Sequence, residues 1–367
     1  MKKILIALCA VATLASCTKN EVLSYDKEAI GFDNAFVDNS TRSVEDPSYT
    51  NSRLFPDFQV YGYVEGAPLF NADNSGVTVT GTGIGDEGTW SYSGTQYWIA
   101  GAHYNFSAVA PATNGNWSKT AADKDATTLS FTNNGTTDLL YAQNDTYTAK
   151  TDGTPNGKVG FTFRHVLSKV KFSFVNAYEA TNSSIRVKDI KILNPYKTGD
   201  VVLKATTDAT PTEWSNQAVD ATTPFILNFG DAALTEEDND ATIDDNDKGY
   251  AFTANNTVES YNELFMIPGA TTNTLTNADG STTTYNYIVE FTVELLVNSQ
   301  EITQYTHTIY TTFAPKPGEA YDLVATIDAD NIDPTTSQEA IEFTVTTITD
   351  WDTDHNDDGA NGDETNI

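Results

Sequence analysis

The residues with the clearest chemistry stand at the start of the chain. A basic Met1-Lys2-Lys3 is followed by an apolar run at residues 4–13 and then by Leu14-Ala15-Ser16-Cys17. This order is typical of a secretory signal. Leu-Ala-Ser-Cys also matches the bacterial lipobox, in which a peptidase cleaves before a cysteine whose thiol receives a diacylglycerol. The sequence therefore predicts a signal peptide over residues 1–16 and a lipid on Cys17, with a plain signal peptide and a chance cysteine as the alternative.

That lipid would be the only membrane attachment of the mature chain. The apolar run is too short to span a bilayer, and no other segment stays apolar over about 18 residues. Cys9 leaves with the signal and Cys17 becomes a thioether, so the mature chain has neither a free thiol nor a disulfide. Its stability must therefore come from the burial of apolar side chains.

A second motif, Gly83-Ile84-Gly85-Asp86-Glu87-Gly88, satisfies the G-x-G-x-x-G pattern of dinucleotide sites. Such a site needs a strand before the motif and a helix after it, because the helix N-terminus meets the pyrophosphate. Trp90-Ser91-Tyr92 follows instead, which is typical of a strand, and the loop itself carries two carboxylates. We therefore interpret this motif as a hairpin loop.

A third motif near the C-terminus matches half of a calcium loop. Asp354, Asn356 and Asp358 offer oxygen ligands at alternate positions, and Gly359 stands at the turn. The twelfth position of such a loop needs a bidentate glutamate, but here it is Thr365. A solvated tail is the favoured interpretation and weak calcium binding is the alternative.

The four histidines, His103, His165, His307 and His355, give no metal or catalytic pattern. None lies in H-E-x-x-H spacing or near another histidine or a cysteine. The chain also lacks a G-x-S-x-G nucleophile motif and a P-loop. His165 stands inside a strong strand pattern, where a packed or capping side chain is expected. The sequence predicts no enzyme and no cofactor, because a hydrolase would rest only on the abundance of carboxylates.

Two arginines mark bonds that a trypsin-like protease could cut. Arg42-Ser43 and Arg53-Leu54 lie in a polar stretch between an apolar patch at residues 29–37 and the first long strand pattern. An exposed Arg–X bond in such a stretch suits proteolysis. Two ordinary surface arginines are the alternative.

The elements that must position these residues are strands. Alternating β-branched and aromatic residues, which fit a pleated, half-buried strand, recur along the chain, and no window of a dozen residues has a convincing helical period. Asn-, Gly- and Asp-rich clusters between the alternating stretches favour tight turns. The predicted strands are 58–64, 97–99, 104–109, 161–163, 166–175, 185–193, 224–229, 264–267, 285–297, 302–312, 321–327 and 341–348.

Length and charge complete this outline. Many short strands joined by turns predict an all-β fold of β-sandwiches, and 367 residues suffice for two. We expect the sandwiches at residues 54–205 and 206–352, after a leader at 17–53 and before an acidic tail at 353–367. The chain carries 20 basic and 51 acidic side chains, a formal net charge of −31. A phosphate backbone would repel this charge, so no nucleic-acid partner is expected.

An ordered set of short motifs resembles the Bacteroidetes fimbrillin family, the lipoprotein pilins of type V fimbriae. Each motif is weak alone, but together they follow in order over nearly the whole chain. They are Leu14-Ala15-Ser16-Cys17, Ala29-Ile30-Gly31-Phe32 followed by Thr41-Arg42, Phe58-Gln59-Val60-Tyr61-Gly62-Tyr63, Tyr97-Trp98 running to Ala110-Pro111, Phe163-Arg164-His165-Val166-Leu167-Ser168-Lys169-Val170, Pro317-Gly318-Glu319-Ala320-Tyr321, Ile341-Glu342-Phe343-Thr344-Val345 and Asp350-Trp351.

The resemblance implies two transthyretin-like β-sandwiches and export as a lipoprotein to the outer membrane of a Gram-negative cell. It further implies that an Arg-specific protease removes an N-terminal placeholder strand. The groove left behind would accept a strand from another fimbrial subunit, which pairs with the exposed backbone groups by β-augmentation. Because this head-to-tail contact does not close, it propagates as a fibre, which would serve adhesion.

On this sequence, the placeholder strand would hold Ile30, Phe32 and Phe36 toward the core. Cleavage between Arg42 and Ser43 is the first choice, because Thr41-Arg42 after the apolar patch fits the family pattern. Cleavage between Arg53 and Leu54 is the second choice, since it would leave less linker before the first strand of the body.

The candidate donor strand holds Ile341, Phe343 and Val345. The same residues could equally form the last strand of the second sandwich. The resemblance does not separate stalk, anchor and tip subunits. The polar tail after Trp351 departs from a hydrophobic donor extension, which favours a terminal or accessory subunit over a stalk subunit.

A non-polymerising surface lipoprotein that binds a glycan or a host protein is the alternative function. Aromatic rings stack on sugars, and Trp90, Tyr92, Tyr97 and Trp98 are the candidate residues. Core packing is the competing interpretation of these four rings, since large aromatic side chains dominate the burial of apolar area.

Overall fold

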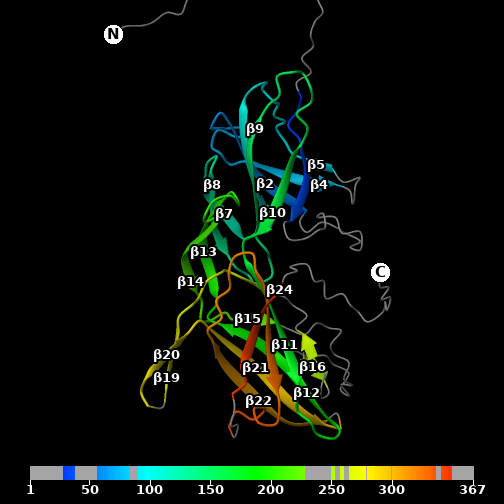
Figure 1. Ribbon diagram of the computed structural model, residues 1–367, viewed down its shortest axis with the longest axis vertical. Coiled ribbons are helices and arrows are strands. Elements are labelled where there is room, and N and C mark those ends of the chain that lie inside the picture. Colours follow the sequence, from blue (N-terminus) through cyan, green and yellow to red (C-terminus); the bar gives the residue numbers. More distant parts are fainter. Residues whose placement is uncertain are drawn as a thin grey trace, which may run out of the picture.

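The computed structural model consists of β-strands joined by turns and loops (Figure 1). It describes residues 28–37, 56–82, 89–227, 249–252, 257–259, 264–277, 279–298, 300–335 and 340–348. No helix occurs in these ranges, which confirms the predicted all-β fold. Within the same ranges, no helix is long and apolar enough to cross a membrane.

The largest sheet has eight strands, in the order β1-β10-β9-β6-β2-β4-β5 with β3 paired to β2. Alternate side chains of this sheet form an aromatic core that includes Phe58, Phe106 and Phe161. Its strands are β1 (Phe32–Val37), β2 (Asp57–Val64), β3 (Ala67–Pro68), β4 (Val77–Thr82), β5 (Thr89–Ser91), β6 (His103–Ala110), β9 (Leu140–Thr148) and β10 (Val159–His165).

A four-stranded sheet packs on the opposite face of the largest sheet. Tyr61 and Tyr63 of β2 point away from the aromatic core and share a second buried cluster with Phe131 and Leu203 of the smaller sheet. Strand β2 is therefore buried on both faces, which accounts for its nearly continuous apolar sequence. The smaller sheet has the order β14-β13-β8-β7 and consists of β7 (Trp117–Ala122), β8 (Ala126–Thr132), β13 (Tyr196–Lys204) and β14 (Thr212–Val219).

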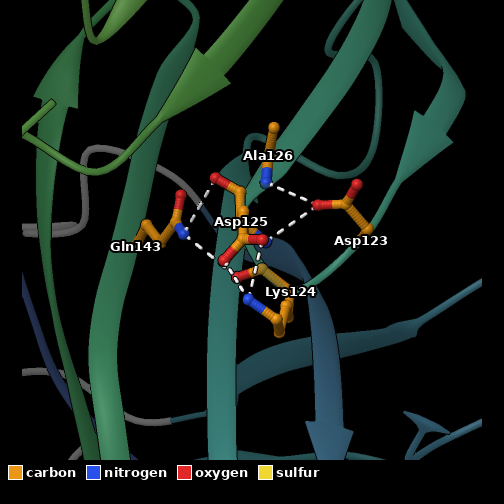
Figure 2. A network of polar contacts seen from close by, with 5 residues as sticks. All are labelled: Asp123, Lys124, Asp125, Ala126 and Gln143. Atoms are coloured by element: carbon orange, nitrogen blue, oxygen red, sulfur yellow. Dashed lines mark hydrogen bonds and ion pairs between the residues drawn. The ribbon is translucent and has the colours of Figure 1, made fainter. Parts of the chain in front are cut away.

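The turn between β7 and β8 ties these two sheets together (Figure 2). The Asp123 carboxylate accepts hydrogen bonds from the backbone N–H groups of Asp125 and Ala126, at 2.8 and 2.9 Å. The side-chain amide of Gln143 in β9 donates to the carbonyl oxygens of Lys124 and Asp125, at 3.2 Å each. The Asp123 side chain therefore has a local structural role.

Two five-stranded sheets form a second sandwich with a separate core, which includes Phe172, Phe174 and Phe291. One sheet contains β11 (Ser168–Asn176), β17 (Thr257–Glu259), β18 (Leu264–Met266), β23 (Ala320–Ile327) and β24 (Phe343–Ile348). The other contains β12 (Ser183–Leu193), β15 (Phe225–Leu227), β16 (Gly249–Phe252), β21 (Tyr287–Val297) and β22 (Gln300–Thr311). A separate hairpin consists of β19 (Asn273–Thr276) and β20 (Thr282–Tyr285).

The strand pairing differs from the division of the chain expected at residue 205. Strands β11 and β12 lie before that residue but belong to the second sandwich, whereas β13 and β14 return to the first. The reason is that β11 pairs with β23 and β12 pairs with β21, both far along the sequence. The polypeptide therefore passes between the two sandwiches three times. Strand β14 lies beyond residue 205 and belongs to the first sandwich (Figure 1).

One predicted strand is wrong. Residues 97–99 have strong β-forming side chains, but among the described residues they make only an isolated bridge from Tyr97 to Ala29. Trp98 turns into the aromatic core while Ile99 stays exposed, so the alternation does not continue into a sheet.

Candidate functional site

The candidate functional site is the position of residues 28–37, which we call the strand slot. Strand β1 is the outermost strand of the largest sheet and pairs with β10 in parallel, from Phe32 opposite Val159 to Val37 opposite Phe163. A tight turn cannot join a parallel pair, and here strands β2 to β9 come between β1 and β10 in the sequence. The first strand of the described residues thus lies beside the strand of its sheet that comes last in the sequence.

Residues 28–31 extend the slot with hydrogen bonds on two sides. On one side, Ile30 N donates to Gln96 O at 2.9 Å and Trp98 N donates to Glu28 O at 3.0 Å. On the other side, Val159 N donates to Gly31 O at 2.8 Å. Removal of this segment would therefore leave unpaired backbone groups on both walls of the slot.

Two side chains of this segment complete the aromatic core. Ile30 and Phe32 are each 1% exposed. The ring of Phe32 lies at the centre of five other aromatic rings, at centroid distances from 5.3 to 6.4 Å. The five rings belong to Phe58, Phe70, Tyr92, Phe106 and Phe161. Without Phe32, this core would be open along one side.

Three of the four aromatic residues considered for sugar stacking instead pack against this core. Trp90 contacts Phe58 at 4.8 Å, and Trp98 packs against the same cluster. Tyr92 donates a hydrogen bond from its hydroxyl to Ile30 O at 2.8 Å and accepts one from Gln96 N at 3.1 Å. Burial raises the pKa of this hydroxyl, so it stays protonated as a donor. Tyr97 is the exception, at 43% exposed.

A carboxylate holds the start of the segment. The Glu28 side chain accepts hydrogen bonds from Asn156 N and Asn156 Nδ2, both at 2.7 Å, and from Gly157 N at 3.0 Å. The Asn156 backbone N–H, followed by those of Gly157 and the Asn156 amide, lowers the pKa of Glu28. These donors from Asn156 and Gly157 form a binding position for a carboxylate at the start of the slot, which we call the seat of Glu28.

The remaining predicted residues of the N-terminal region lie partly outside the described residues. Cys17, Arg42, Ser43, Arg53 and Leu54 are outside them. For Phe36, the structure gives the backbone position in β1, opposite Thr162. The calcium-loop candidates Asp354, Asn356 and Asp358, like the glycine motif at 83–88, are also outside the described residues.

The candidate donor residues lie in and just before β24. This strand is the outermost strand of its sheet and pairs with β23 in antiparallel fashion. Ile341 is 2% exposed, and the ring of Phe343 contacts Phe172 at 5.3 Å. Val345 is 40% exposed. In this arrangement Ile341 and Phe343 pack into the core of the second sandwich of the same chain.

Two of the described histidines, His165 and His307, are buried and make structural contacts. His165 is buried, and its Nδ1 lies 2.5 Å from the Asp138 carboxylate. The ring of His307 stacks on Phe291, and its Nε2 donates to Ile332 O at 3.1 Å. The part of the chain that the structure describes holds no group of three His, Cys, Asp or Glu side chains arranged around a metal position.

Sequence reasoning missed the seat residues Asn156 and Gly157 and the neighbouring Lys158. They lie 128 or more positions from Glu28, and nothing in their local pattern indicates a partner. The apolar alternation of Ile30 and Phe32, by contrast, was a usable signal for a buried strand.

A comparison with protein families finds a match over most of the chain. Residues 41–351 match the sequence profile of a family described as fimbrillin-like. A search of the curated proteins finds no match.

Solved structures also resemble it at low sequence identity. A fimbrial protein from Bacteroides vulgatus is 17% identical with a TM-score of 0.46, over 87% of this chain and 98% of that one. A candidate cell adhesion protein from Bacteroides uniformis is 14% identical, with a TM-score of 0.44, over 89% and 99%. The fimbrial anchor protein Mfa2 from Porphyromonas gingivalis is 10% identical, with a TM-score of 0.35, over 89% and 97%. Because the profile spans most of the sequence, the chain belongs to the fimbrillin-like family.

Proposed function

We propose that the chain is a structural subunit of a cell-surface fimbria that polymerises by donor-strand exchange at the strand slot. The observation that carries the proposal is the position of Phe32 among five aromatic rings on an outermost strand. This segment is part of the core, yet its only covalent link to the following strands is the stretch of residues 38–55. Membership of the fimbrillin-like family supports the same role.

The physical basis is the state of the slot after the segment leaves. Backbone groups of β10 on one wall and of residues 96–98 on the other would lose their partners. The aromatic core would be exposed to water at the same time. A strand from a neighbouring subunit restores both the hydrogen bonds and the apolar contacts, and such an addition continues from subunit to subunit.

Release of the segment requires a cut between β1 and β2. Arg42 follows the last residue of β1 by five positions, and Arg53 precedes the first residue of β2 by four. Cleavage after Arg42 leaves a longer free end before β2 than cleavage after Arg53. We therefore propose Arg42-Ser43 as the processing site of an Arg-specific protease, with Arg53-Leu54 as the second choice.

The donor in this proposal is the segment with Ile341, Phe343 and Val345. It is an outermost strand with alternate apolar side chains, as a strand that enters the slot must be. Export as a lipoprotein on Cys17 would bring the subunit to the outer membrane, where the leader is removed.

Processing and assembly test the proposal together. Surface-extracted wild-type protein is expected to begin at Ser43 and to form SDS-resistant ladders. The Arg42→Ala variant is expected to keep residues 17–42 and to stay monomeric, while Arg53→Ala serves as the matched control and behaves as wild type. Wild-type material whose only N-terminus is lipidated Cys17, and which forms no oligomers, would overturn a polymerising role.

A further inference from the structure

Strand β22, at one side of the second sandwich, has a long edge without a neighbouring strand in the described part of the chain. It has twelve residues and pairs there only with β21 (Figure 1). From Thr303 to Thr311 the register against β21 is regular, without a bulge. In such an outermost strand, alternate backbone N–H and C=O groups point away from the sheet. We call this row of groups, over residues 303–311, the β22 edge.

The β22 edge lacks the features that protect the other described edges. Proteins protect an exposed edge by short length, bulges, charged side chains or proline. Strands β5, β15 and β17 have three residues each, and β24 is half as long as β22. Strands β1, β7 and β14 have register shifts and carry Asp33, Lys119 and Glu213. Residues 302–312 contain no Pro, Gly, Lys, Arg, Asp or Glu, so this edge can accept a further strand.

The composition of β22 suits contact with another copy of this acidic chain. Residues 302–312 hold five threonines, two isoleucines and two tyrosines, which are residue types enriched in strands. Ile302 is 61% exposed. His307 is buried, and burial lowers its pKa, so it stays neutral at pH 7. Since the chain has a net charge of −31, an uncharged edge is a place where two copies can meet without like charges in contact.

We propose that the β22 edge binds the β22 edge of a second copy in antiparallel fashion, about a twofold axis at His307. Thr303 of one copy then lies opposite Thr311 of the other, and the two five-stranded sheets become one continuous sheet. Because both copies use the same surface, the contact closes on a dimer. It is separate from the strand slot, whose head-to-tail contact extends a fibre, and it would join two fibres side by side.

Backbone geometry and sequence together select this register. Backbone groups alternate between the two sides of a strand, so an edge pairs with itself only when the twofold axis passes through a residue. An axis at His307 pairs residues 303–311 completely and leaves Glu301 outside, whereas an axis at Thr306 would place Glu301 within the joint sheet. With the axis at His307, Thr306 also faces Thr308 of the second copy, a cross-strand pair that favours a sheet.

Sedimentation of the purified mature chain, with the leader uncut and Cys17→Ser to remove the lipid, tests the dimer apart from the fibre. We expect the average mass to rise from monomer towards dimer with concentration. The rise should be steeper at high salt, which screens the repulsion between two acidic copies. In SDS the protein should run as a monomer, because neither copy gives up part of its core. A monomer mass up to about 500 µM in about 0.5 M salt would overturn the proposal.

Charge variants of two exposed threonines test the edge and the register. Thr306→Lys with Thr308→Lys places like charges opposite each other and should abolish the dimer, whereas Thr306→Lys with Thr308→Glu places opposite charges there and should restore it. The matched control, Ser118→Lys with Thr120→Lys, adds the same charge to exposed positions of the outermost strand β7 and should dimerise as wild type does. A Lys–Lys variant that still dimerises, a Lys–Glu variant that stays monomeric, or a control that loses the dimer would each overturn the proposal.

Discussion

Replacement of Phe32 by alanine is the most direct test of how the placeholder strand is held. Phe32 is 1% exposed, and five aromatic rings surround it. Truncation of a fully buried phenylalanine costs about 3–5 kcal/mol through lost transfer free energy and the cavity left behind. Because the neighbouring rings come from three different strands and from the segments before β4 and after β5, they cannot all close the gap, and we expect about 4 kcal/mol.

The assay measures retention of the leader rather than stability alone. Mature protein is cut after Arg42, and the amount of residues 17–42 that stays bound is followed by size-exclusion chromatography. A loss of about 4 kcal/mol corresponds to roughly a thousandfold weaker retention. The Phe32→Ala leader should therefore separate from the body under conditions in which the wild-type leader co-elutes with it.

The matched control is Phe174→Ala in the other sandwich. Phe174 is fully buried and its ring contacts Phe291 at 5.0 Å, so its truncation should lower the free energy of unfolding by a similar amount. It should leave retention of the leader unchanged. If Phe32→Ala retains its leader as wild type does, the reasoning from the aromatic core is refuted. If Phe174→Ala also releases it, release reports general unfolding.

Three further predictions concern single polar groups. The donors of Asn156 lower the pKa of Glu28. The stabilisation of the bound leader by this carboxylate is therefore complete above the ordinary pKa of 4.5 and is lost as the pH falls through the lowered pKa. Leader retention should drop in that acidic range, and the Glu28→Gln variant should show no such drop. Tyr92→Phe removes the hydrogen bond to Ile30 and should weaken leader retention by about 1 kcal/mol, roughly fivefold, with no effect on the second sandwich. Burial lowers the pKa of His307, so the second sandwich should lose stability as the pH falls below the ordinary value of 6.5; urea unfolding between pH 7.5 and 5.5 should show this slope for wild type and not for His307→Phe.

Local patterns predicted many of the strands, but they missed all four strands of the smaller sheet, β7, β8, β13 and β14, and they did not predict the strand partners. Along β21, buried and half-buried residues alternate from Tyr287 to Val293, as the sequence alternation indicates. Tyr97, Trp98 and Ile99 have the same kind of side chains, yet they flank residues 28–30 as an irregular segment. Side-chain period reports which face a residue occupies, whereas the pairing of segments depends on contacts between residues far apart in the chain.

In the candidate site, too, local sequence predicts which residues are buried but not which distant residues they contact. Ile30 and Phe32 could be predicted as buried because their spacing places them on one face of a strand. The seat of Glu28 could not be predicted, because Asn156 and Gly157 occupy an ordinary turn-forming sequence more than a hundred residues away. A carboxylate at the start of a strand becomes informative only when its donors are known.

The threefold passage of the chain between the two sandwiches has a mechanical consequence. The connections are short, at residues 166–167, 194–195 and 220–224, and Val166 and Leu167 are fully buried. A tensile load applied along a fibre would be divided among three covalent connections rather than stretching one linker. The joint between the sandwiches would then resist both extension and bending, so a subunit pulled by shear would yield first where strands are held without covalent bonds.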